Sequence, residues 1–226
     1  FIWTDSPFTE CKDGKLIRGK YDRNGCFGIN YFAFQVAFNY GYKEIDNKWQ
    51  MSYKDKRTFL ARDYIVNVAK YWLSLGIDGY RVDMAFALVK NDPTQEATIE
   101  VLHDLFNKIK ADYPDAIFIS EWNGPKEAFK AGFDIDFVLS DERTFYYWFL
   151  RPDGRKTIFD GADLTYAIKD LNERIQIAKE HNSFLGIISG NHDLPRIADT
   201  LNEQDVKLWF LIMFTLSGVP FIYQGD

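Results

Sequence analysis

Residues 76–83 read Gly-Ile-Asp-Gly-Tyr-Arg-Val-Asp, a short stretch suited to a strand that ends on charged side chains. Before it, from residue 58, apolar residues recur every three or four positions, which is typical of one face of an amphipathic helix. Those positions are Leu60, Tyr64, Val68, Trp72 and Leu75. Gly76 is a natural helix stop, and residues 77–82 are predicted to form a buried strand. The sequence therefore predicts a helix followed at once by a strand.

The same alternation continues to the end of the chain. Asp92-Pro93 places a capping acid before a proline of the first helical turn, and apolar residues at 101–109 continue that helix. Further strands are predicted at residues 116–119, 133–139, 184–188 and 219–223, with helices from Pro125, at 164–175 and at 206–216. Five strands with four helices between them predict an α/β fold with a parallel sheet. Periodicity alone leaves open a doubly wound sheet or a (β/α)8 TIM barrel.

Length and composition narrow the classes of partner. A chain of 226 residues fits one domain. Its net charge of −6 provides no broad basic face, so we expect neither nucleic acid nor an anionic membrane as partner, and a neutral sugar fits better. No apolar run reaches the roughly 18 residues that span a bilayer.

The N-terminal part and the cysteines give weaker signals. Residues 1–57 show no sustained period, which predicts an irregular segment. They begin with neither a methionine nor a signal peptide, so we expect a piece of a longer chain, whose localisation stays unknown. Cys11 and Cys26 indicate neither a disulfide framework nor a zinc site; they could bridge or remain free.

Polar residues gather just past the predicted strand ends. Arg81 and Asp83 follow the first strand, Glu121 the second, and Asn-His-Asp at 191–193 the fourth. In parallel α/β folds the active site lies at the edge of the sheet where the strands have their carboxyl ends. Several carboxylates close together at this edge suit the hydrolysis of a glycosidic bond. Arg81 would point to the same side of its strand as Asp83 and orient that carboxylate as a nucleophile.

Each of these residues also has a plainer interpretation. An acid after a strand often caps the next helix, Arg81 suits an ordinary ion pair, and His192 taken alone is more often structural than catalytic. Only the joint pattern favours a catalytic site.

Four stretches, in this order, resemble the motifs of the α-amylase family. Residues 76–83 resemble its strand-four motif and 118–122, Phe-Ile-Ser-Glu-Trp, its strand-five motif. Residues 189–193, Ser-Gly-Asn-His-Asp, resemble the strand-seven motif and 218–225, Gly-Val-Pro-Phe-Ile-Tyr-Gln-Gly, the strand-eight signature. The resemblance implies a (β/α)8 TIM barrel, truncated here to about strands four to eight over residues 58–226. Residues 1–57 would be the tail of the family's inserted domain between strand three and helix three.

The resemblance also implies an activity and roles. The expected enzyme is a retaining α-glycoside hydrolase acting on α-glucans such as starch and maltooligosaccharides. Asp83 would be the nucleophile, Glu121 the general acid and base, and Asp193 the carboxylate that stabilises the transition state. The substrate-binding residues would be Arg81, Asn191, His192, Tyr80 and Trp122. No cofactor is certain, calcium is expected only in the complete domain, the parent chain would supply the other half of the barrel, and family habit favours an extracytoplasmic location.

Two departures from the family pattern limit what can be predicted. Phe86 and Ala87 stand where many amylases have a Lys-His pair, and the strand-three motif has no match. Linkage, chain-length preference and the balance of hydrolysis against transglycosylation therefore stay open, as does an α-glucosidase or transglycosylase within the family. Tyr146, Tyr147 and Trp148 are candidates either for stacking on sugar or for packing under a loop.

Rival functions would require other sequence features. A non-catalytic, amylase-like carbohydrate-binding or partner domain predicts missing carboxylates, and all of them are present, although truncation would have the same effect as their loss. A serine hydrolase would need Gly-x-Ser-x-Gly, and a nucleotide-binding protein a glycine-rich phosphate loop; neither pattern occurs.

Overall fold

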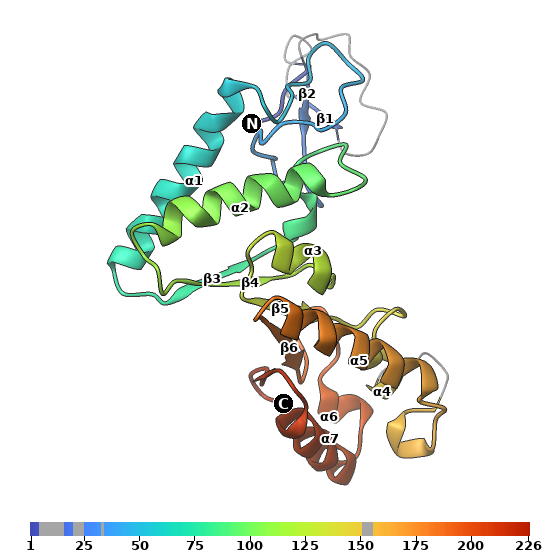
Figure 1. The fold of residues 1–226 in the computed structure, drawn as a ribbon. Coiled ribbons are helices and arrows are strands. Elements are labelled where there is room, and N and C mark those ends of the chain that lie inside the picture. The colour runs from blue at the N-terminus through green and yellow to red at the C-terminus, as the bar shows by residue number, and fades with distance from the viewer. Residues whose placement is uncertain (5–15, 20–24, 33, 151–155) are drawn as a thin grey trace. The chain divides into compact units, whose positions relative to one another are not determined.

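The computed structural model describes residues 1–4, 16–19, 25–32, 34–150 and 156–226 (Figure 1). Its contacts divide the chain into two compact units. The helix-pair unit comprises residues 1–78 and 84–116, and the sheet unit comprises residues 79–83 and 117–226. Every residue predicted for the active site falls in the sheet unit, which is therefore described first.

The sheet unit is built on parallel strands whose spatial order, β3-β4-β5-β6-β7, is their order along the chain. The strands are β3 (Gly79–Val82), β4 (Ile117–Ser120), β5 (Ile135–Val138), β6 (Phe184–Ile188) and β7 (Val219–Phe221). A doubly wound sheet reverses its order at a switch point, whereas a (β/α)8 barrel adds each strand beside the previous one. The sequential order therefore decides for the barrel arrangement that periodicity alone left open.

The register brings the carboxyl ends of the strands to one edge. Val82, the last residue of β3, pairs with Ser120, the last of β4, and Ile188 pairs with Phe221 in the same way across β6 and β7. Residues that follow these strands are thus placed at the edge where parallel α/β folds carry their active sites. The apolar core beneath includes the buried side chains of Phe118, Val138, Leu185 and Ile187.

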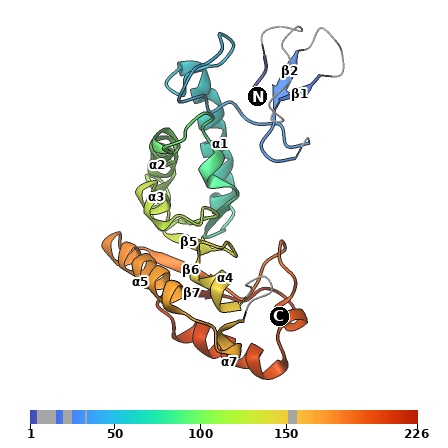
Figure 2. The ribbon, with the colours of Figure 1, turned by 90° about the vertical axis from the view of Figure 1, so that its right-hand side faces the viewer.

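The helices of the sheet unit connect successive strands. They are α3 (Pro125–Lys130), α4 (Phe145–Leu150), the 3-10 helix η3 (Ile158–Asp160), α5 (Thr165–Glu180), α6 (Ile197–Thr200) and α7 (Glu203–Thr215). Helix α3 contacts β5 and α5, and α5 lies along β6 (Figure 2). The short helices α4 and α6 were not predicted. Helix α4 reads Phe-Tyr-Tyr-Trp-Phe-Leu, and without a polar face it has no amphipathic period to detect.

The predicted strands are all present, but one expectation about their burial is wrong. Strand β3 was predicted to be buried, and its residues are half-buried or exposed. The reason is its position: in the part of the chain that the structure describes, β3 is at the edge of the sheet and pairs with β4 alone. Its polar Arg81 therefore needs no buried partner.

The helix-pair unit takes its name from α1 (Lys56–Ser74) and α2 (Glu96–Lys110), which pack against each other (Figure 1). The predicted helix stop is confirmed, since Gly76 follows α1 with φ +96°, a left-handed conformation that favours glycine. A 3-10 helix, η2 (Ala85–Ala87), precedes α2. The apolar residues expected on α2 are buried, namely Val101, Leu102, Leu105, Phe106 and Ile109. Among the described residues, no helix combines the length and apolarity needed to cross a membrane.

The helix predicted from residue 58 is present as α1, but its apolar face is largely exposed. Leu60 and Tyr64 are 74% and 58% exposed, and the opposite face, with Arg62 and Val66, is buried instead. Polar residues are accommodated there because Arg62 donates to the backbone carbonyl of Tyr53. Helix α1 therefore has apolar side chains on two faces, and periodicity identified the one that this packing leaves exposed.

The start of α2 also differs from the prediction. The helix begins at Glu96, after Gln95 in a left-handed conformation, and not at Asp92-Pro93. Asp92 nevertheless accepts a hydrogen bond from the backbone N–H of Thr98 at 2.7 Å. The acid thus caps the first turn from a loop outside the helix.

Residues 1–57 are not wholly irregular as predicted. Strands β1 (Leu16–Arg18) and β2 (Cys26–Gly28) form an antiparallel pair, too short for its period to be detected in the sequence. Cys26 is buried and disulfide-bonded, whereas Cys11 lies outside the described residues. The described part of this segment shares its unit with α1 and α2. The predicted assignment of residues 1–57 to an inserted domain stays a prediction.

Candidate active site

Arg81 joins two of the predicted catalytic carboxylates. One guanidinium nitrogen pairs with Asp83, and the other lies 2.8 Å from Oε1 of Glu121. The Asp83 side chain is 62% exposed and that of Glu121 only 14% exposed. A planar guanidinium has donors on two edges, so it can hold two carboxylates at once and offset the repulsion between them.

The sheet register explains why these residues meet. Arg81 on β3 is paired with Ile119 on β4, and Glu121 follows two residues later on the same side of the strand. The backbone N–H of Glu121 donates to the carbonyl of Val82 at 3.1 Å, which extends the pairing of the strands past the end of β4. Neighbouring strand ends therefore place the guanidinium and both carboxylates together.

The loop after β6 carries the other predicted polar residues. The side-chain oxygen of Asn191 accepts the backbone N–H of Asp193 at 3.0 Å, which closes a tight turn. Nε2 of His192 lies 3.4 Å from Oδ2 of Asp193, and both side chains are 63% exposed. His192 and Asp193 thus present their polar groups outward from this turn.

One pocket of the sheet unit is lined both by Arg81 and by residues of the loop after β6. Arg81, Asn191 and His192 line it, together with apolar side chains from the later strands, Phe137, Ile188 and Phe221. The structure therefore brings Arg81, Asp83 and Glu121 together by direct contact and places Asn191 and His192 around the same pocket as Arg81. Asp193 is linked to this arrangement through His192.

The aromatic candidates lie elsewhere. Tyr80 stacks on Phe118 with ring centroids 6.2 Å apart, and burial raises the pKa of its hydroxyl. Trp122 is buried, with its ring edge-on to Phe133 at 6.3 Å. The structure thus places both rings against the apolar core, and their predicted contact with substrate stays untested.

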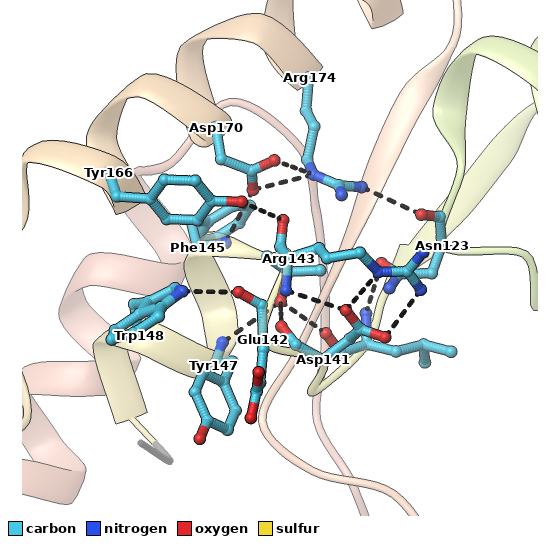
Figure 3. A network of polar contacts seen from close by, with 12 residues as sticks. Asn123, Asp141, Glu142, Arg143, Phe145, Tyr147, Trp148, Tyr166, Asp170 and Arg174 are labelled. Carbon is cyan, nitrogen blue, oxygen red and sulfur yellow. Dashed lines mark hydrogen bonds and ion pairs between the residues drawn. The ribbon is translucent and has the colours of Figure 1, made fainter. Parts of the chain in front are cut away.

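The aromatic run in α4 is also mostly internal. Tyr146 and Tyr147 are buried, and the hydroxyl of Tyr146 donates to the carbonyl of Ser189 at 3.0 Å. Trp148 donates from its ring to the carbonyl of Glu142 at 2.7 Å (Figure 3). The Tyr146 ring lies edge-on to Trp209 of α7 at 5.9 Å, and the two expectations for this aromatic run, stacking on sugar or packing under a loop, both stay predictions.

Asp136 is a buried carboxyl next to the site that sequence reasoning missed. It is completely buried in β5, and its Oδ1 accepts the hydroxyl of Ser120 at 2.6 Å. Burial raises the pKa of Asp136 to about 7, against the lowering effects of Ser120 and Arg174. An available signal was the acid inside the otherwise apolar strand Ile-Asp-Phe-Val.

The residues described do not fit a calcium site. Among them, no group of three or more histidine, cysteine or acidic side chains is placed to hold a metal ion. Calcium prefers six to eight oxygen ligands with several carboxylates. No chemical step is therefore assigned to a metal.

The chain is similar to known proteins of one family. A family model described as the α-amylase catalytic domain matches residues 40–226. The cyclomaltodextrinase of Thermoanaerobacter pseudethanolicus is 26% identical over 234 residues, covering 90% of this chain and 38% of that protein. The 4-α-glucanotransferase of Thermotoga neapolitana is 29% identical over 164 residues, covering 70% of this chain and 33% of that protein.

Solved structures show the same likeness. The crystal structure of a maltogenic amylase from S. marinus superposes with a TM-score of 0.56 at 26% identity, covering 78% of this chain and 23% of that one. The chain spans 26–38% of the length of the first curated relatives it matches. It therefore belongs to the α-amylase family, and it carries part of the (β/α)8 catalytic domain.

Proposed function

We propose that this protein is a retaining glycosidase that acts on α-glucans, with Asp83 as nucleophile and Glu121 as general acid and base. The observation that supports it best is the paired contact of Arg81 with both carboxylates at adjacent strand ends. The difference in exposure supports the division of roles. The more exposed Asp83 is open to attack a sugar, and the enclosed Glu121 is better shielded from water that would compete for its proton.

The proposed reaction has two displacements. In the first, an oxygen of Asp83 forms a bond to the anomeric carbon while the bond to the leaving oxygen breaks, and Glu121 gives its proton to that oxygen. In the second, Glu121 takes a proton from water, whose oxygen displaces Asp83 and inverts the anomeric carbon again, so that the configuration of the substrate is retained overall. Asp193 would stabilise the positive charge that develops on the ring, and His192 would bind a sugar hydroxyl at the pocket it lines.

The relatives support the proposed substrate class. A cyclomaltodextrinase and a 4-α-glucanotransferase are named for α-glucan substrates, which supports α-glucans for this chain. A sugar hydroxyl in place of water in the second displacement would make the same site a transferase. Product analysis after incubation with maltotetraose separates the two, since only transfer yields oligosaccharides longer than the substrate.

A mechanism-based label tests the proposal directly. The chain is incubated with a 5-fluoro-α-glucosyl fluoride, digested, and mapped by mass spectrometry, with Asp83→Asn as control. A label on the peptide containing Asp83, absent from Asp83→Asn, is the expected result. No label on a cooperatively folded chain that still binds maltotetraose by calorimetry would identify a binding domain and overturn the proposal.

A further inference from the structure

Asp136 lies directly behind the strand end that carries Glu121. It is paired in register with Ser120, whose hydroxyl donates to its Oδ1 at 2.6 Å. Successive residues of a strand point to opposite faces, so this contact lies on the face opposite the Glu121 side chain. Asp136 therefore acts on the backbone of β4 and not on substrate.

The same carboxyl also holds the residues that follow Glu121. The backbone N–H of Asn123 donates to Oδ1 of Asp136 at 3.3 Å, and the backbone N–H of Trp122 donates to this carboxyl as well. One buried group thus bonds to the residue before Glu121 and to the two residues after it. Such bonds restrict the backbone dihedrals that set the direction of the side chain between them.

Asn123 is held from two further sides. Its backbone is in the left-handed region with φ +60°, and its side-chain oxygen accepts the backbone N–H of Leu139 at 3.2 Å. Its carbonyl accepts from Arg174 on α5 at 3.5 Å, and Arg174 is itself held by Asp170 at 2.9 Å (Figure 3). A left-handed non-glycine residue is costly and persists where its surroundings fix it. The bend after Glu121 is therefore a firmly held feature.

The other carboxyl oxygen of Asp136 indicates that this arrangement is costly. Oδ2 is buried and finds no hydrogen-bond partner among the described residues. A buried polar atom without a partner costs free energy that an apolar residue would avoid. We propose that Asp136 is a positioning residue for the reaction proposed above, because its carboxyl fixes the backbone on both sides of Glu121 and so aims the acid and base group at the leaving oxygen.

The test compares two substrates in the full chain. Maltotetraose needs a proton on its leaving oxygen, whereas α-maltosyl fluoride does not, because fluoride is a good leaving group. We expect Asp136→Ala to lower kcat/KM for maltotetraose by about 10- to 100-fold, a part of what general acid catalysis contributes, and for the fluoride by less than about 3-fold. Asp136→Asn, which keeps one acceptor oxygen, should recover most of the loss.

Val138→Ala is the matched control, since Val138 is buried on the same strand and the same face. This substitution should lower kcat/KM for maltotetraose and for α-maltosyl fluoride by the same factor, or leave both unchanged. Equal losses on both substrates for Asp136→Ala would overturn the positioning role while leaving the proposed function standing. A wild-type chain that is inactive and takes no label from the 5-fluoro-α-glucosyl fluoride would instead count against the proposed function.

In that case the crystal structure of Asp136→Asn tests the positioning role. A Glu121 carboxyl that has not moved and still contacts Arg81 would overturn this role, and a displaced carboxyl would support it.

Discussion

The guanidinium of Arg81 contacts both Asp83 and Glu121. Lysine carries a compact charge without the planar fork, so Arg81→Lys should hold one carboxylate at a time. We expect kcat/KM for maltotetraose to fall by at least about 10-fold, in line with the cost of losing a charge-assisted hydrogen bond. Steady-state kinetics measures this loss.

Arg143→Lys is the control for that substitution. Arg143 also forms a forked pair, with Asp141, but its side chain is 79% exposed and lies outside the pocket lined by Arg81. Its replacement should leave activity within about 2-fold, because exposed ion pairs contribute little. Equal losses for both variants would show that the fork of Arg81 has no special role.

Asp136 makes the stability of the protein depend on pH. Burial raises its pKa in the folded state from 3.8 to about 7, so between these values the folded state holds a proton that the unfolded state has lost. The free energy of unfolding should therefore fall as pH rises through this window, by up to about 1.4 kcal/mol per pH unit from this group. Urea unfolding of wild type and Asp136→Asn at several pH values measures the difference. Parallel pH dependences would contradict the assignment.

Among single residues, the proposed catalytic acids could be singled out because they follow strand ends, where a charged side chain needs no buried partner; their roles stay predictions. Asp136 could not be assigned in the same way. Its function depends on Ser120 and Asn123, which are far from it in sequence and meet it only through the pairing of β4 with β5. The sequence around Asp136 therefore reveals the acid but not the groups that donate hydrogen bonds to it.

At the scale of elements, the pairing of β3 with β4 depends on Gly79. A Cβ at this position would lie 2.0 Å from the backbone oxygen of Ile117, far inside contact distance. We expect Gly79→Ala to separate the strands and lower the free energy of unfolding by at least about 2 kcal/mol, as overpacking against backbone does. Gly161→Ala is the control, because its Cβ would meet nothing within 4 Å, and it should cost only about 1 kcal/mol for its left-handed backbone. Similar costs for both, measured by urea unfolding, would contradict this account.

The type and order of the helices and strands could be predicted from the sequence, but the face that each element buries was harder to predict. Strands and helices follow from the alternation of short apolar runs with helical periods. The buried face of α1 did not follow, because Leu60 and Val66 lie on different apolar faces and only the packing partner decides between them. The small pair β1 and β2 has three residues a strand, too few for any period.

For the whole molecule, exposed apolar side chains predict self-association. Helix α7 exposes Leu208, Leu211 and Phe214, spaced to form one stripe, and among the described residues β3 and β7 each pair with one strand only. We expect sedimentation velocity to show association that increases with concentration, and Leu211→Lys with Phe214→Lys to reduce it. A monomer at all concentrations would contradict this expectation. Met213→Lys, at a buried position of the same helix, is the control and should unfold the chain instead.

The sequential strand order described above has a consequence for synthesis. Each strand from β4 to β7 pairs with the strand made just before it, so none of these four must wait for a later segment to find its first neighbour. On the ribosome, where the N-terminal part emerges first, the sheet can grow by one strand and one crossover at a time. Each connection between paired strands runs through one or more helices. Because the entropy cost of closing a loop grows only slowly with its length, these longer crossovers add little to the cost of each addition. The direction in which the polypeptide is translated is thus also the direction in which its sheet can be built.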